Sequence, residues 1–452
     1  MKILRFYWQR RLRKQEDLCS ALPSPILPIL PTEIWHKIIA FVVRLAGATS
    51  IGLDDPFATP HMYEEYPDID PALFEDRKAV SLVCSGWNEV VTEISSQYLV
   101  IYSGKQLKNL VKKFESSKNP QGRRLGDWTT RIDFKILGQY KIEHVVRLLR
   151  CTPNLVIYNN GNGTPSIPEK CTPREVIDAL VANCSQFLQR VEWSGAGESP
   201  RYRDLVKLCN GLPNLTTLRL LAIHSYPLRH DGIPPRLHLP KLNTLSLGVI
   251  PDPIGRSAEF LLTWDLFLQY ISSSPFQLPA LERFECDIFP LQTMSFFSKH
   301  GQKIRLFRTT AWSAEKPLPE ALSLCPNLQS LVISQGSETR ISLPVFHPAL
   351  QRICILPSVE VEIGVPQRVY DSAVMTPLDT LLKSFERMVA PNLVEMRIRN
   401  TGAYGSIIEY STWLHFWWIR WNIRGVQFCD KAGTSWKYVH DPGEALLDSI
   451  RC

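Results

Sequence analysis

One short phrase recurs six times between residues 213 and 398. It consists of Pro, any residue and Leu, with apolar residues three and five positions after the Leu. The copies begin at Pro213, Pro240, Pro279, Pro326, Pro348 and Pro391. Because side chains alternate along a strand, the two later apolar residues share one buried face of a short strand. One such strand cannot bury its own apolar face, so the copies must stack. The phrase therefore predicts a solenoid with a broad binding surface rather than a deep active site.

The repeats are unequal in length. The leucines that open them lie at positions 155, 188, 215, 242, 281, 328, 350 and 393. The unit at Leu188 keeps the spacing without the Pro, and we expect the longest gap to contain a degenerate unit near residues 303–307. Spacings of about 20–29 residues are typical of leucine-rich repeats. The Asn or Cys that such repeats carry three residues after the last apolar position is missing, so we expect no regular asparagine ladder there.

Helical patterns lie between the expected strands, at residues 143–150, 172–184, 202–209, 263–272 and 378–388. In one of them, Thr172 is the expected N-cap and Pro173 the first helical residue. Alternating strand, turn and helix predicts an α/β fold with a parallel sheet on the concave face and helices outside. The alternative is an ordinary α/β domain with Pro-marked strands, which six close copies of one phrase disfavour.

The charge distribution argues against a nucleic-acid partner, although the formal net charge is +7. Six basic residues lie within the first fourteen, and the others are dispersed among acids. Residues 45–76 contain eight acids and no Lys or Arg. A nucleic-acid-binding protein would concentrate its basic residues on one face. We interpret residues 1–27 as a basic, flexible tail, with nuclear import or contact with an acidic partner as alternatives.

Composition indicates a cytoplasmic or nuclear protein without a membrane partner. No apolar run reaches the roughly 18 residues of a membrane span. Four prolines between residues 21 and 31 exclude the helical centre of a secretion signal. The eleven cysteines are scattered and contain no C-x-x-C pair, which indicates a reducing compartment. We expect four of them to be small buried apolar side chains: Cys84, Cys209, Cys286 and Cys354.

Residues 28–97 form a second unit with helical patterns. Pro31 is expected at the first position of a helix whose apolar residues recur at helical spacing to Leu45. A second apolar pattern starts at Pro71, with a break between two short helices expected at Gly86. The acidic stretch 46–70 between the two patterns has the composition of an inserted surface loop.

The residues of this unit carry a family resemblance. Leu30-Pro31-x-Glu33-Ile34 with Ile38-Ile39, followed by Val83-Cys84-x-x-Trp87, resembles the F-box, whose pattern is L-P-x-E-[IL]-x-x-x-I and then V-C-[KR]-x-W. The resemblance implies a three-helix unit that docks on the small adaptor subunit of SCF-type cullin-RING ubiquitin ligases and, through it, on a cullin. A second domain, often of leucine-rich repeats, then holds a protein substrate. The implied adaptor-binding residues are Leu30, Pro31, Ile34, Ile38, Ile39, Val83, Cys84 and Trp87.

Two features depart from the family pattern. The separation of Pro31 and Trp87 is about twice that of a compact F-box, and Ser85 stands where a basic residue is usual. Neither departure removes an apolar docking residue. The order of F-box and repeats still resembles fungal F-box proteins with degenerate leucine-rich repeats. The alternative interpretation is that these helices only cap the first repeat, since solenoids require end caps.

The remaining residues, 98–452, are expected to form the irregular leucine-rich-repeat solenoid. Its aromatic end, about 405–452, carries Trp413, Trp417 and Trp421 four residues apart, on one helix face. Trp is common at binding hot spots. We favour a cap over the last repeat, because large rings close an apolar solenoid end well.

The concave sheet is the expected surface for an unknown protein partner. The residues predicted to point onto it are Arg219, Ser246, Glu285, Asp287, Arg397 and Arg399. Their mixed charges predict a polar, charge-complementary partner.

No catalytic or metal-binding motif is present in the sequence. Residues 159–164 superficially resemble a phosphate loop, but they lack the Lys, and we interpret them as a flexible turn. We therefore predict a non-catalytic substrate receptor without cofactor or metal. The alternatives are a repeat protein with no ubiquitin-ligase link and an enzyme with an unrecognised site.

Overall fold

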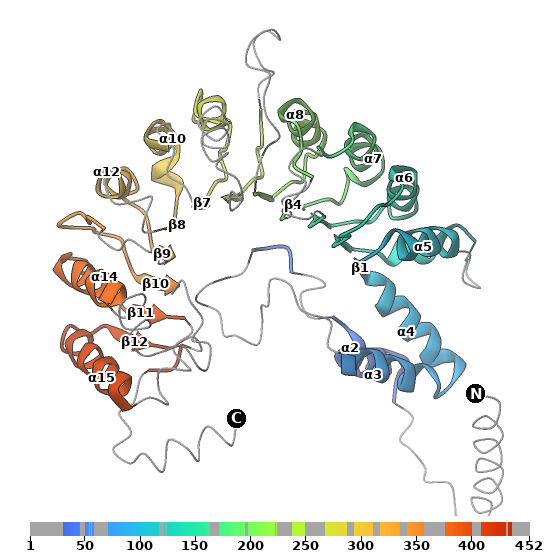
Figure 1. Ribbon diagram of the computed structural model, residues 1–452, viewed down its shortest axis with the longest axis horizontal. Helices are drawn as coiled ribbons and strands as arrows, with labels where there is room; N and C mark the ends of the chain where they lie inside the picture. The colour runs from blue at the N-terminus through green and yellow to red at the C-terminus, as the bar shows by residue number, and fades with distance from the viewer. Residues whose placement is uncertain are drawn as a thin grey trace, which may run out of the picture.

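The sheet of this protein contains twelve parallel strands. The computed structural model describes residues 30–45, 50–53, 55, 57, 71–116, 122, 124–162, 171–194, 198–221, 223, 237–248, 267–286, 293–310, 317–334, 341–356, 376–399, 408–430 and 433–435. The spatial order of the strands follows the chain, from β1 to β12. The strands line the inside of an arc and the helices cover its outside (Figure 1). The predicted α/β class and parallel sheet are confirmed, in a solenoid-like arrangement.

The strands are short and evenly paired. They are β1 (Tyr98–Ile101), β2 (Arg131–Phe134), β3 (Ile157–Asn160), β4 (Arg190–Trp193), β5 (Thr217–Leu220), β6 (Thr244–Leu247), β7 (Arg283–Cys286), β8 (Leu306–Thr310), β9 (Ser330–Ser334), β10 (Arg352–Leu356), β11 (Glu395–Ile398) and β12 (Gln427–Cys429). Leu218 pairs in register with Leu245, and both are buried, as the repeated phrase predicts. The degenerate unit is β8, with Phe307 buried. The Pro-x-Leu phrase does not precede β1, β2 or β12 in the sequence.

Most helices lie where the patterns predict them. The α-helices are α2 (Thr32–Val43), α3 (Pro71–Ser81), α4 (Ser85–Gln97), α5 (Gly104–Ser116), α6 (Ile142–Cys151), α7 (Arg174–Cys184), α8 (Tyr202–Gly211), α10 (Thr293–His300), α12 (Leu318–Ser323), α14 (Thr376–Arg387) and α15 (Ile408–Ile423); the 3-10 helices are η2 (Leu125–Trp128) and η3 (Gly301–Lys303). Of the predicted helix 263–272, the structure describes residues 267–272, and 267–271 are helical.

The prediction that Thr172 caps a helix is wrong. Its hydroxyl donates to the Glu198 carbonyl at 2.7 Å and accepts from the Trp193 indole at 2.8 Å.

Asparagine side chains link neighbouring repeats at a position that we did not single out. In four Pro-Asn-Leu turns the Asn amide donates to a main-chain carbonyl of the preceding repeat. The four residues and their distances are Asn154 (2.8 Å), Asn214 (2.7 Å), Asn327 (2.8 Å) and Asn392 (2.6 Å). Each bond satisfies a turn carbonyl that a strand ladder does not reach. Recurrence of Asn within the phrase is the sequence signal for this contact.

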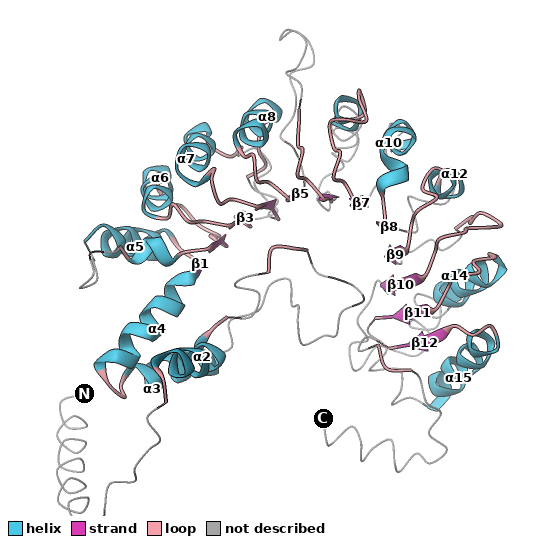
Figure 2. Cartoon of the chain, turned by 180° about the vertical axis from the view of Figure 1, so that it is seen from behind, coloured by secondary structure: helices cyan, strands magenta, loops and turns pink. Residues whose placement is uncertain are grey.

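Helices α2, α3 and α4 form a small unit at the N-terminal end of the arc. Its core comprises Ile39, Ala40, Val43, Val91 and Ile94. The break between α3 and α4 falls at residues 82–84, whereas we expected it at Gly86, which lies inside α4. Helix α4 runs directly into β1, where the solenoid was expected to start. Figure 2 shows α4 joining the helical unit to the first strand.

At the other end of the arc, α15 packs on the last strands (Figure 1). Trp417 and Trp421 are buried in the main core, and the Trp417 indole donates to the Asp379 carboxylate of α14 at 3.1 Å. This is the position that the predicted aromatic cap requires.

Across the part of the chain that the structure describes, no helix is long and apolar enough to cross a membrane.

Three of the four cysteines expected in the core are buried: Cys209, Cys286 and Cys354. Burial raises the pKa of the Cys209 thiol to about 12. The prediction is wrong for Cys84, which is exposed. Cys84 lies in the break between α3 and α4, so the neighbouring helices do not cover its side chain.

Candidate partner-binding surfaces

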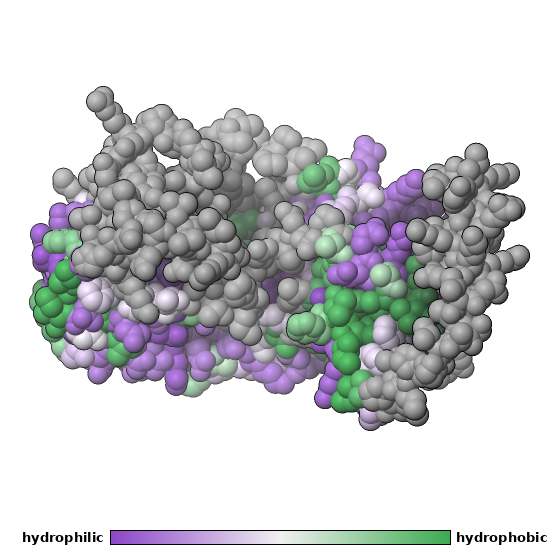
Figure 3. All heavy atoms as spheres, turned by 90° about the horizontal axis from the view of Figure 1, so that it is seen from below, coloured by the Kyte–Doolittle hydropathy of each residue, from purple (hydrophilic) through white to green (hydrophobic). Residues whose placement is uncertain are grey.

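An apolar patch covers the helical unit. We define it by its exposed large apolar residues: Ile34, Ile38, Phe41, Val42, Phe74, Leu82 and Val83. Phe41 is 92% exposed and Leu82 75%. In the space-filling view, apolar side chains gather over this end of the molecule (Figure 3). Single exposed apolar residues are ordinary on protein surfaces, but a contiguous patch marks an interaction site.

The predicted adaptor-binding residues divide into two groups. Pro31, Ile34, Ile38, Val83 and Cys84 are exposed. Ile39 is buried in the core, while Leu30 and Trp87 are half-buried. The Trp87 ring packs on that of Trp35, with centroids 5.0 Å apart. The first group is available to a partner, and Ile39 and Trp87 hold the helices that present it.

Sequence reasoning did not assign a docking role to Phe41, Phe74 or Leu82. Helix α2 carries the signal for Phe41. Its apolar residues surround much of the helix, more than one packed face can bury, so some of them must remain outside. Phe74 and Leu82 lie on or just after α3, and no periodic stripe marks them.

The concave sheet carries repeated ion pairs within single strands. Arg131 donates to both oxygens of Asp133 at 2.9 and 2.8 Å, and both side chains are buried. The same two-residue spacing pairs Arg190 with Glu192, Arg283 with Glu285, and Arg397 with Glu395. Side chains two positions apart lie on the same face of a strand. The polar face opposite the core is therefore a surface of fixed charges, with little side-chain freedom.

Of the residues predicted for the concave face, those within the named strands occupy positions that alternate with the core, but several are buried. Ser246, Glu285 and Arg397 are buried, and Arg219 and Arg399 are half-buried; Asp287 is outside the described residues. The Ser246 hydroxyl donates to Glu285 at 2.7 Å. Burial alone would raise the pKa of Glu285, yet Arg283 and Arg308 lower it, so this carboxylate is charged.

Residues of the expected insertion lie against this concave sheet. Just before the insertion, Leu45 packs on Tyr98 and Val100 of β1. One Arg190 amino group donates to the Ser50 and Gly52 carbonyls at 3.2 and 2.5 Å. The segment of residues 50–53 stands inside the arc in Figure 1.

Further along the arc, Arg283 donates to the Leu53 carbonyl at 3.2 Å. Phe57 is buried against Val332 and Cys354, under the guanidinium of Arg352 at 4.4 Å from the ring centroid. The expectation of a plain surface loop is therefore wrong for Leu53 and Phe57, which are buried. The sequence offers one signal, which is that this acidic stretch also contains apolar residues, Leu53 and Phe57 among them.

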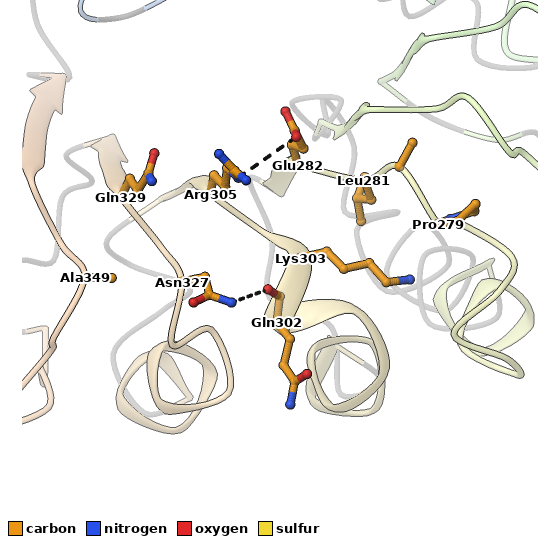
Figure 4. Close-up of a pocket in the computed structure, with 10 residues that line it drawn as sticks. Pro279, Leu281, Glu282, Gln302, Lys303, Arg305, Asn327, Gln329 and Ala349 are labelled. Carbon is orange, nitrogen blue, oxygen red and sulfur yellow. Dashed lines mark hydrogen bonds and ion pairs between the residues drawn. The ribbon is translucent and has the colours of Figure 1, made fainter.

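A pocket of about 340 Å³ lies between the turns that precede β7, β8 and β9. Figure 4 shows Asn327 and Arg305 directed at groups of the neighbouring repeat. Lys303 reaches the Pro275 and Leu278 carbonyls, and burial lowers its pKa. The polar groups of this pocket thus hold neighbouring repeats together. The arrangement is that of a groove between structural turns, without a pair of groups poised for proton transfer.

A buried carboxylate lies near the end of β3. Glu198 accepts from the Tyr140 hydroxyl at 2.6 Å and from the Asn160 and Asn162 amides at 3.2 and 3.3 Å. Burial and the charge of Glu198 raise the pKa of Tyr140. Asn159, Asn160 and Asn162 are thus buried and hydrogen-bonded, which corrects our interpretation of a flexible turn for these three; residues 163 and 164 are outside the described residues. Among the described residues, no three metal-ligating side chains cluster.

Comparison with protein-family models finds no match for this chain, and neither does comparison with curated proteins.

Proposed function

We propose that this protein is the substrate-receptor subunit of an SCF-type cullin-RING ubiquitin ligase. In this role the helical unit is an F-box that binds the small adaptor, and through it a cullin. The sheet and outer helices are degenerate leucine-rich repeats that bind a protein substrate. The protein itself is non-catalytic, and it acts in the cytoplasm or nucleus.

The apolar patch is the observation that carries this proposal. Its members Ile34, Ile38 and Val83 stand at motif positions of the F-box resemblance, and they are exposed although they are apolar. The helices that carry or flank these residues are fixed from behind by a separate core. A rigid, contiguous apolar surface is what a stable protein interface needs at its centre.

A double variant tests the docking surface. Ile38→Asp with Val83→Asp places two charges in the patch and should abolish co-purification with the adaptor. Apolar anchors at an interface centre typically contribute more than about 1–2 kcal/mol each, so two losses weaken binding by at least tenfold. Both side chains are exposed, so the fold should survive.

The matched control is Ile423→Asp, at the far end of the arc, where the side chain is 80% exposed. This variant should bind the adaptor as wild type does. If the double variant retains the adaptor and its circular-dichroism melt is unchanged, the proposed docking is wrong.

A second candidate is a repeat protein without a ligase link, in which the helices serve as a cap. The packing of α4 on η2 and β1 favours it. The Thr129 hydroxyl donates to the Ser96 carbonyl at 2.8 Å across this junction. The same co-purification decides between the two, because a pure cap binds no adaptor.

A further inference from the structure

The concave face already holds a peptide segment, and that segment belongs to the same chain. Its described residues, 50–53, 55 and 57, lie far in sequence from the strands that they contact. Two kinds of contact hold the segment. Arginines bind its main-chain carbonyls, and an apolar slot takes the ring of Phe57.

We propose that this slot binds an aromatic side chain of an extended, acidic peptide in the partner protein, and that Phe57 occupies it as an internal competitor. The inference rests on the proposed function, because it specifies the substrate segment that the concave sheet receives.

The slot interrupts a polar surface. Strands β8, β9 and β10 place apolar side chains at concave positions where other strands carry charges. We name them the aromatic slot: Leu306, Val332, Cys354 and Leu356, with Arg352 above. Val332 and Cys354 are neighbours in register. A guanidinium over a ring face adds a cation–π attraction to the burial of the ring. A planar aromatic side chain therefore fits this slot better than an aliphatic one.

Among the described residues of the segment, the two arginines upstream of the slot contact main-chain carbonyls. Arg190 and Arg283 donate to the carbonyls of Ser50, Gly52 and Leu53. Main-chain carbonyls are present in every peptide, so these contacts favour an extended chain of any sequence. Specificity then comes from the slot and from charge.

The charge of the concave face favours an acidic ligand. Within the named strands, its positions carry seven arginines: Arg131, Arg190, Arg219, Arg283, Arg308, Arg352 and Arg397. They carry four carboxylates: Asp133, Glu192, Glu285 and Glu395. The difference, 7 − 4, is three positive charges. Asp54 and Asp55 precede Phe57 in the internal segment, and the Asp55 carboxylate accepts from the Phe57 amide at 3.0 Å. The internal segment thus shows the chemistry that we assign to the partner.

A segment tethered in the same chain competes at an effective concentration in the millimolar range. An external peptide should therefore bind poorly to wild type and better when the internal anchor is removed. The probe is a fluorescein-labelled synthetic peptide of residues 48–60, measured by anisotropy with the full-length protein. We expect at least tenfold tighter binding to Phe57→Ala than to wild type.

Three controls define the slot. The same peptide with Ala in place of Phe57 should not bind. Adding Arg352→Glu to the Phe57→Ala protein should abolish binding, while its circular-dichroism melt stays unchanged. Phe276→Ala, which truncates a ring that is 77% exposed elsewhere, should behave as wild type. Failure of the peptide to bind folded Phe57→Ala overturns the proposal, and so does equal binding with Arg352→Glu.

Alkylation of Cys354 gives a second readout that requires no peptide affinity. Its thiol lies in the slot beside Phe57 and is buried. Iodoacetamide should modify it at least tenfold faster in Phe57→Ala, as followed by peptide mass spectrometry, and added peptide should suppress the reaction. Cys209, in the main core, should stay unmodified in both proteins. An unchanged Cys354 rate would show that Phe57 does not cover the slot.

The outcomes separate this proposal from the proposed function. Adaptor capture depends on the apolar patch, whereas peptide binding depends on the concave sheet. A protein that fails to capture the adaptor can still be tested for peptide binding, and a protein that fails to bind the peptide can still be tested for adaptor capture.

Discussion

At the scale of a residue, His300 is a buried imidazole at the end of α10. Its Nε2 lies 2.8 Å from the Ile271 carbonyl, and because a carbonyl only accepts, Nε2 carries the proton. Nδ1 is buried and has no hydrogen-bond partner among the residues that the structure describes. Burial lowers the pKa of His300 to about 4, with a smaller contribution from the charge of Lys303.

This lowered pKa predicts that the folded protein loses stability as the pH is lowered below 6.5. Between pH 6.5 and 4 the unfolded chain binds a proton at His300 that the folded chain does not. As the pH falls through that window, the free energy of unfolding therefore decreases by up to about 1.4 kcal/mol per pH unit. His300→Gln removes this titration and should give a shallower pH dependence. Urea unfolding of both proteins at pH 7, 6 and 5 measures the difference, and parallel curves would contradict it.

At the scale of an element, α15 closes the C-terminal end of the core. Trp417 is fully buried there, whereas its neighbour Phe416 is 46% exposed. Truncating a buried Trp costs about 3–5 kcal/mol. Because solenoid stability is largely local, Trp417→Ala should first expose β11 and β12 and leave β1–β4 protected. Hydrogen exchange followed by mass spectrometry tests this. Phe416→Ala is the control, and an equal effect from it would contradict a cap centred on Trp417.

Elements whose residues follow a repeated local pattern, such as the Pro-x-Leu phrase, were predictable from the sequence. Strands such as β5 and β6 follow from the Pro-x-Leu phrase, since the positions of the buried leucines fix the strand and its face. Strands β1, β2 and β12 lack the phrase, and four or fewer residues are too short to show periodicity by themselves.

The position of residues 50–53, 55 and 57 was not predictable from sequence. Arg190 and the Gly52 carbonyl are 138 residues apart, and the contact exists only because the sheet curves around the segment. Likewise, the resemblance names Ile38 and Ile39 together, but only the packed helices show that one is exposed and the other buried. Local pattern indicates which side chains are apolar, whereas exposure depends on the final packing.

At the scale of the molecule, the apolar patch and the aromatic slot lie on one continuous structure of helical unit and sheet. The apolar patch lies at the N-terminal end of the arc, and the aromatic slot lies on its inner face toward the other end (Figures 1 and 3). Gln97 ends α4 and Tyr98 begins β1, so no linker residue separates the helical unit from the sheet. The Thr130 amide also donates to the Gln97 carbonyl at 2.9 Å, which ties this junction to the next strand. A partner on the sheet would therefore stand at a fixed offset from whatever binds the patch.

This rigidity predicts a narrow distance distribution between the helical unit and the sheet. Spin labels on the exposed Cys84 and on a Phe276→Cys variant, measured by double electron–electron resonance, should give one narrow distribution. The other reactive cysteines are replaced by Ser in this background. Two glycines inserted between Gln97 and Tyr98 should broaden the distribution, because they separate α4 from the strand that now continues it. Adaptor capture should stay unchanged, since the insertion does not touch the apolar patch. A wild-type distribution as broad as that of the insertion variant would show that the helical unit moves independently of the sheet.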